Sequence, residues 1–150
     1  MKVALVQCSY LIGQLEANAD RILRAVQEIE RQGGEVAVFS ELALTGYPPM
    51  DLLDNFKFVD QCAEVLVEMA RQVPIPVLLG APSREGQGIY NAYFRLQEEG
   101  VSELGRKVLL PNYDVFDESR YFLPGSSYST TALGRYQAGI AVCEDLWAED

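Results

Sequence analysis

The chain has 150 residues, an apolar fraction of 49% and a formal net charge of −10. A chain of this length can bury one hydrophobic core and is expected to form one domain. The 22 acidic against 12 basic side chains disfavour nucleic acid and anionic membranes, because both require a cationic protein surface. No apolar run approaches the roughly 20 residues of a membrane span, so we expect no membrane association.

Histidine is absent, and the only cysteines are Cys8, Cys62 and Cys143. Three scattered cysteines argue against a disulfide framework and against a cysteine-rich zinc site. The lack of His removes Ser-His-Asp and Cys-His catalysis, so the general base of any enzymatic site must be Asp, Glu, Lys or Tyr. Residues 1–6 indicate a first strand rather than a secretion signal, and the expected location is cytoplasmic.

The first part of the sequence predicts a βαβ unit. Residues 2–7 form an apolar run that indicates a buried strand. Residues 18–32 carry apolar side chains at spacings of three and four, which predicts a helix capped by Asn18 and ended by Gly33 and Gly34. Residues 36–39 predict the next strand. Because a helix connects the two strands, they are expected to be parallel.

The remaining sequence predicts a second helix and further strands. The helix covers residues 55–72, and its buried face is expected to hold Val59, Cys62, Leu66 and Met69. A third strand follows at residues 77–81. Two antiparallel hairpins are then expected on either side of a loop over residues 111–125, pairing 90–97 with 101–109 and 128–133 with 137–142. The pattern indicates an α/β fold with helices on one face of a sheet that continues into antiparallel hairpins.

Three of the predicted strands lead to an ionisable residue, namely Glu41, Lys107 and Cys143. The strand before Cys143 is an apolar run, so we expect it to be buried. Sites in open α/β sheets lie at the carboxyl ends of strands, so these residues are expected to converge. A thiol has a pKa of about 8.5 and is mostly protonated at neutral pH. A carboxylate could take its proton during attack, and an ammonium could stabilise the oxyanion of a tetrahedral intermediate. The set is sufficient for acyl transfer without His or metal.

Each of these residues also has a simpler interpretation. Cys143 could be a small buried apolar side chain at a strand end. Glu41 could accept backbone N–H groups in a turn, and Lys107 could be a solvated charge at a strand edge. Mg²⁺ could in principle bind four acids near the end of the sequence, Glu144, Asp145, Glu149 and Asp150. A solvated acidic tail explains those acids more simply, so no metal is expected.

Three stretches resemble, in order and spacing, the motifs of the carbon–nitrogen hydrolase (nitrilase) superfamily. They are residues 39–49 (FSELALTGYPP), 106–113 (RKVLLPNY) and 142–147 (VCEDLW). The resemblance covers essentially the whole chain, and three linked motifs are a specific signal. The residues of these stretches most resemble the glutamine-hydrolysing domain of glutamine-dependent NAD(+) synthetases.

The resemblance implies a role for each matching residue. Glu41 would be the general base, Lys107 the oxyanion stabiliser and Cys143 the nucleophile. The backbone N–H of Glu144 would complete the oxyanion hole. Glu118 matches the second glutamate of the superfamily, which positions the lysine and the substrate; the alternative is a solvated loop acid.

The resemblance also implies positions near the substrate for two aromatic residues. Tyr47 and Tyr113 fall where the subgroup lines its glutamine pocket and ammonia exit. Packing in the core or in a loop would explain either ring nearly as well.

The resemblance implies a four-layer αββα sandwich of the nitrilase type, of which residues 1–150 would be only the N-terminal part. The rest of that domain and any ATP-dependent synthetase domain are expected to lie outside this sequence. Amide hydrolysis would need no cofactor, whereas ATP and Mg²⁺ would serve only the synthetase domain. The isolated chain is expected to fold poorly, or to associate with itself or with the missing part, and homo-oligomers are expected for the parent protein.

The leading hypothesis is hydrolysis of the glutamine amide through a thioester, with the ammonia used to make NAD(+) from deamido-NAD(+) in a longer protein. One alternative is a stand-alone amidase or carbamoylase that accepts another small amide. A second is a non-catalytic assembly module. A nucleotide-binding module ranks last, because the loop at residues 8–13 (CSYLIG) lacks the paired glycines that let a backbone approach phosphate.

Overall fold

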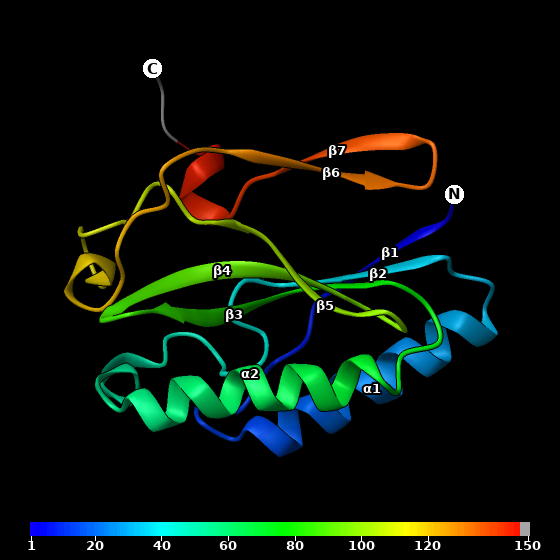
Figure 1. Ribbon diagram of the computed structural model, residues 1–150, viewed down its shortest axis with the longest axis horizontal. Helices are drawn as coiled ribbons and strands as arrows, with labels where there is room; N and C mark the ends of the chain where they lie inside the picture. Colours follow the sequence, from blue (N-terminus) through cyan, green and yellow to red (C-terminus); the bar gives the residue numbers. More distant parts are fainter. Residues whose placement is uncertain (148–150) are drawn as a thin grey trace.

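The computed structural model describes residues 1–147, which form two helices, a five-stranded sheet and a two-stranded sheet in three layers (Figure 1). The strands of the larger sheet lie side by side in chain order: β1 (Val3–Val6), β2 (Val36–Phe39), β3 (Val77–Glu85), β4 (Gly88–Gln97) and β5 (Gly100–Arg106). The first three strands are parallel to one another, and β4 and β5 each pair antiparallel with the strand before them. The smaller sheet pairs β6 (Ser129–Leu133) with β7 (Tyr136–Ile140). The βαβ unit and both hairpins are confirmed.

The helices α1 (Leu15–Arg31) and α2 (Phe56–Ala70) cover one face of the larger sheet (Figure 1). All four side chains expected on the buried face of α2 are buried, together with Ile22 and Val26 of α1. All but Val59 pack against the inward side chains of the sheet, and Val59 belongs to a second cluster with Leu42 and Ile89. Each large side chain buried in this way contributes roughly 1.5–3 kcal/mol. Among residues 1–147, no helix is long and apolar enough to cross a membrane.

The prediction that Asn18 caps α1 is wrong. The helix begins at Leu15, and Asn18 lies inside its first turns with 1% of its surface exposed. Its side chain bonds both backbone groups of Leu11, at 2.9 and 2.7 Å, and donates to the carbonyl of Leu44 at 2.9 Å. Asn18 therefore ties the loop before α1 to the segment after β2. The other end of α1 is as predicted, because Gly33 has a φ of 74° and Gly34 bonds Ile29.

The expectation that the first strand is buried is also wrong. β1 is an edge strand of the larger sheet, and Val3 and Leu5 are 40% and 82% exposed. Only Val6 packs against the helix-side core. Side chains alternate along a strand, so Val3 and Leu5 lie on the face opposite the helices. The apolar run signals a strand correctly but does not reveal that one face is uncovered.

The smaller sheet lies on the face of the larger sheet opposite the helices (Figure 1). Leu133 of β6 packs there against Val36 and Leu78. β7 is half exposed along its length, so the expectation of a buried strand before the cysteine is wrong. A two-stranded hairpin buries only one face, and the alternation of side chains leaves the other face in water. Cys143 lies three residues beyond β7, in the 3₁₀ turn η3 (Cys143–Leu146).

Candidate active site

Glu41 lies in the tight turn that follows β2, and a glycine allows that turn to rest on β3. The N–H of Gly80 donates to the carbonyl of Ser40 at 3.2 Å, and its carbonyl accepts from Leu44 at 3.3 Å. A Cβ at position 80 would come within 2.3 Å of the backbone nitrogen of Leu42. Any larger residue would displace the turn, so Gly80 fixes Glu41 at the end of the sheet.

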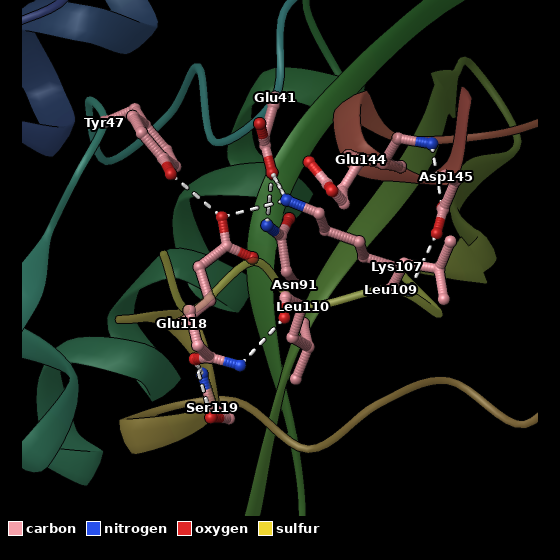
Figure 2. A network of polar contacts seen from close by, with 12 residues as sticks. Glu41, Tyr47, Asn91, Lys107, Leu109, Leu110, Glu118, Ser119, Glu144 and Asp145 are labelled. Carbon is pink, nitrogen blue, oxygen red and sulfur yellow. Dashed lines mark hydrogen bonds and ion pairs between the residues drawn. The ribbon is translucent and has the colours of Figure 1, made fainter. Parts of the chain in front are cut away.

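Lys107 follows β5 and is fully buried. Its backbone N–H donates to Asn91 at 2.8 Å, and its carbonyl accepts from Gly125 at 2.7 Å. Its Nζ lies 2.7 Å from Oε1 of Glu41 and 2.9 Å from Oε1 of Glu118, as Figure 2 shows. The interpretation of Lys107 as a solvated edge charge is therefore wrong. An ammonium without water is stable only with such partners.

Glu118 begins the short 3₁₀ turn η2 (Glu118–Arg120), and only 6% of its side chain is exposed. Its Oε1 accepts the hydroxyl of Tyr47 at 2.9 Å in addition to the lysine ammonium. Its Oε2 is buried without a partner among the described residues. Burial raises the pKa of Glu118, and Lys107 partly offsets that effect. The alternative of a solvated loop acid is wrong.

Asn91 of β4 belongs to this cluster and was missed by the sequence reasoning. It is 1% exposed, and its Nδ2 donates to Oε1 of Glu41 at 2.7 Å (Figure 2). Lys107 and Asn91 thus share one carboxylate oxygen and leave the other oxygen of Glu41 free of both. The signal was an Asn within a predicted strand, where this residue is depleted and where burial demands a partner.

The Cys143 thiol lies within the electrostatic influence of the same cluster. Partial burial raises its pKa, the charge of Glu41 raises it further, and Lys107 acts in the opposite direction. Burial alone would lower the pKa of Lys107, but Glu41 and Glu118 outweigh burial and the pKa is raised. The raised pKa values keep the thiol and the lysine protonated at neutral pH, so attack by the thiol requires a base.

Cys143 is exposed, so the interpretation as a buried apolar side chain is wrong. Its φ is 48°, a left-handed conformation that costs a residue with a Cβ roughly 1 kcal/mol. The next residue, Glu144, accepts the hydroxyl of Tyr113 at 2.9 Å. Asp145 accepts backbone N–H groups rather than lying free in solvent. Glu149 and Asp150 lie outside the described residues.

The two tyrosines assigned from the resemblance lie on either side of Phe116. The ring centroid of Phe116 is 6.5 Å from that of Tyr47 and 5.6 Å from that of Tyr113. Each hydroxyl binds an acid of the site, Glu118 and Glu144 respectively. Tyr47, Phe116 and Glu118 also line a largely apolar cavity of about 320 Å³, whose other walls include Pro48, Pro49, Met50, Leu53, Val115, Tyr121 and Phe122.

This architecture and its buried Glu–Lys–Glu cluster agree with the family match. The carbon–nitrogen hydrolase family model matches residues 2–149, and the chain therefore belongs to that family. Its fold is of the nitrilase type: a nitrilase-superfamily amidase from Nesterenkonia aligns over 99% of this chain with a TM-score of 0.83 and 26% identity. The alignment covers 57% of the amidase.

The curated relatives point to a narrower class of enzyme than the family match does. The glutamine-dependent NAD(+) synthetase of Synechocystis sp. is 35% identical over 99% of this chain and 28% of its own length. That of Thermotoga maritima is 34% identical over 98% of this chain and 26% of its own length. The chain spans about a quarter of the length of these relatives.

Solved structures give the same result. The glutamine-dependent NAD+ synthetase of Acinetobacter baumannii, solved in complex with ADP, aligns with a TM-score of 0.89 and 28% identity. The alignment covers 97% of this chain and 28% of that protein. A mutant of the Nesterenkonia amidase shows the result of Michael addition of acrylamide at its active site cysteine, with 25% identity and a TM-score of 0.81 over 97% of this chain.

Proposed function

We propose that residues 1–150 are the N-terminal part of a glutaminase domain that supplies ammonia for NAD(+) synthesis from deamido-NAD(+) in a longer protein. The observation that carries the proposal is the convergence of Glu41, Lys107 and Glu118 within hydrogen-bond distance, beside a thiol whose pKa they perturb. The similarity to glutamine-dependent NAD(+) synthetases supports glutamine as the amide. ATP and Mg²⁺ would serve only the synthetase reaction elsewhere in that protein.

In the proposed first step, Sγ of Cys143 attacks the side-chain amide carbon of glutamine. The oxygen of Glu41 that is free of Lys107 and Asn91 accepts the thiol proton. The amide oxygen becomes an oxyanion. An ammonium carries three N–H donors, and Lys107 directs two of them at carboxylates, so one remains for this oxygen together with the N–H of Glu144.

Collapse of the intermediate breaks the carbon–nitrogen bond. Glu41 returns the proton to the leaving nitrogen, ammonia departs and a thioester remains on Cys143. Glu41 then deprotonates a water molecule, which attacks the thioester carbonyl. The sulfur leaves and is reprotonated, and glutamate is released. Every proton passes through Glu41, so no His, metal or cofactor is required.

An electrophilic glutamine analogue tests the proposal. The protein is incubated with the analogue, and the adduct is located by mass spectrometry. We expect a single adduct on Cys143 and none in Cys143→Ala, while Cys62, which is fully buried, stays unlabelled. An adduct on any other residue, or glutaminase activity that survives Cys143→Ala, would refute the assignment.

A stand-alone amidase is the second candidate, favoured by the similarity to the Nesterenkonia amidase. Hydrolysis rates for glutamine and for simple aliphatic amides separate the two functions. A preference for glutamine supports the glutaminase, and a preference for aliphatic amides supports the amidase. Absence of turnover with both, in protein whose thiol still reacts, would instead support a non-catalytic assembly module.

A further inference from the structure

Asp145 connects the two chain segments that carry Lys107 and Cys143. One carboxylate oxygen, Oδ1, accepts the backbone N–H of Val108 at 3.0 Å and that of Leu109 at 2.8 Å. The other, Oδ2, accepts the backbone N–H of Val142 at 3.0 Å. Figure 2 shows the side chain of Asp145 directed at the segment that follows Lys107. Two charge-assisted hydrogen bonds thus join segments that lie more than 30 residues apart in the sequence, and the third closes the turn that contains Asp145 itself.

Both segments need such an acceptor. β5 ends at Arg106, so the N–H groups of Val108 and Leu109 have left the strand ladder. They find their acceptor on Asp145, as buried backbone donors require. Cys143 has a strained φ, and Asp145 returns a backbone hydrogen bond from its own N–H to the carbonyl of Val142 at 3.1 Å. The reciprocal pair closes the turn that holds Cys143.

We infer that Asp145 is a positioning residue that fixes the distance between the lysine ammonium and the turn of the nucleophile. The inference rests on the proposed function. The oxyanion must be reached at once by Nζ of Lys107 and by the N–H of Glu144, which belong to different segments. A donor displaced by a fraction of an ångström stabilises the oxyanion poorly, and Asp145 holds the backbone that follows Lys107 and the backbone of the turn that contains Glu144.

Two alkylating reagents separate this role from ordinary turn stabilisation. Sγ of Cys143 adds to the terminal carbon of acrylamide. Negative charge then lies on the amide oxygen until the carbon next to the carbonyl takes up a proton. Iodoacetamide is attacked at its methylene carbon and loses iodide, so no oxyanion forms. Both reagents consume the same thiolate. The ratio of their rates therefore reports the oxyanion donors independently of the pKa of Cys143.

The variant Asp145→Asn, made in the full chain, is compared with the wild type and with Glu64→Gln, an exposed acid on α2. The amide nitrogen cannot accept a hydrogen bond, so the side chain loses either its bonds to Val108 and Leu109 or its bond to Val142. We expect the kcat for glutamine to fall roughly 100-fold with KM nearly unchanged. The ratio of acrylamide to iodoacetamide rates is expected to fall as well, while Glu64→Gln matches the wild type in every measurement.

An unchanged kcat and an unchanged rate ratio in folded Asp145→Asn would overturn the inference. Equal slowing of both reagents would also overturn it, because that result indicates a general loss of the thiol. If Asp145→Asn does not unfold cooperatively, Asp145→Glu replaces it, since this variant keeps the charge but moves the carboxylate by one methylene. A wild type without glutamine turnover refutes the proposed function, and the rate ratio still decides the role of Asp145.

Discussion

The two halves of the site are built in opposite ways. Glu41, Lys107 and Glu118 form a buried cluster, which we call the ionic cluster, in which charged side chains bind one another at 2.7 and 2.9 Å. Cys143 lies in an exposed turn, and there the hydrogen bonds run from backbone N–H groups to the carboxylate of Asp145. One half is held by ion pairs between side chains, and the other by backbone N–H groups that bind a single carboxylate.

The difference follows from what each half must do. Charges removed from water are costly unless they are paired, so the ionic cluster must be complete in order to fold. A nucleophile must be reached by substrate, so its turn stays at the surface and accepts backbone strain. Substitutions in the ionic cluster should therefore affect both stability and activity. Substitutions in the cysteine turn should affect activity alone.

Lys107→Met should have the largest effect. It removes the oxyanion donor, so glutamine hydrolysis is expected to be undetectable. It also leaves Glu41 and Glu118 without their shared partner, which should cost about 3–5 kcal/mol of unfolding free energy. Urea unfolding at pH 7.5 measures this cost. Cys143→Ser serves as the matched control, because it should abolish turnover without a comparable loss of stability.

The pH dependence of the unfolding free energy of Lys107→Met tests whether unpaired charge causes its instability. The pKa of Glu118 is already raised by burial, and loss of Lys107 raises it further. The folded state then holds a proton that the unfolded state has released, so stability increases as pH falls through the raised pKa. The stability gap to the wild type should narrow between pH 7.5 and pH 5. A constant gap would show that lost packing, rather than charge, causes the instability.

Asn91→Leu should have a smaller effect than Lys107→Met. It removes one of the two donors on Oε1 of Glu41 and leaves the size of the side chain nearly unchanged. A hydrogen bond to a charged group is worth about 1.5–3 kcal/mol, which corresponds to roughly a 10–100-fold loss of kcat. Thr131→Val, a buried polar position in the smaller sheet, is the control and should retain full activity. Equal activity losses in both variants would refute a specific role for Asn91.

The sequence reasoning predicted the residues of the ionic cluster but not what holds them. Glu41, Lys107 and Glu118 stand in recognisable stretches, so their convergence could be predicted from motif order and strand ends. Asn91 and Asp145 act through side-chain hydrogen bonds to partners 36 or more residues away, and no local periodicity encodes such contacts. The burial of β1 and β7 was misjudged for a related reason, since an apolar run does not say which face another layer covers.

Glu41→Gln should separate the two halves. Glutamine hydrolysis is expected to be lost with the base, yet Cys143 should become more reactive to iodoacetamide at pH 7.5. The charge of Glu41 raises the pKa of the thiol, so its removal lowers that pKa and increases the thiolate fraction. Each pKa unit changes this fraction about tenfold, so a severalfold faster alkylation is expected. Slower alkylation would show that the charge of Glu41 does not reach the thiol.

The two tyrosines provide the smallest and most selective test, because one touches each half. Tyr113→Phe removes a hydrogen bond to Glu144 at the surface, and no change in the unfolding midpoint is expected. Tyr47→Phe removes a hydrogen bond to the buried Glu118 and should cost about 1 kcal/mol. It should also raise the pKa of Glu118 further, because that hydrogen bond lowers it. Equal unfolding midpoints for the two variants would contradict the division of the site into a buried half held by ion pairs and an exposed half held by hydrogen bonds of backbone N–H groups.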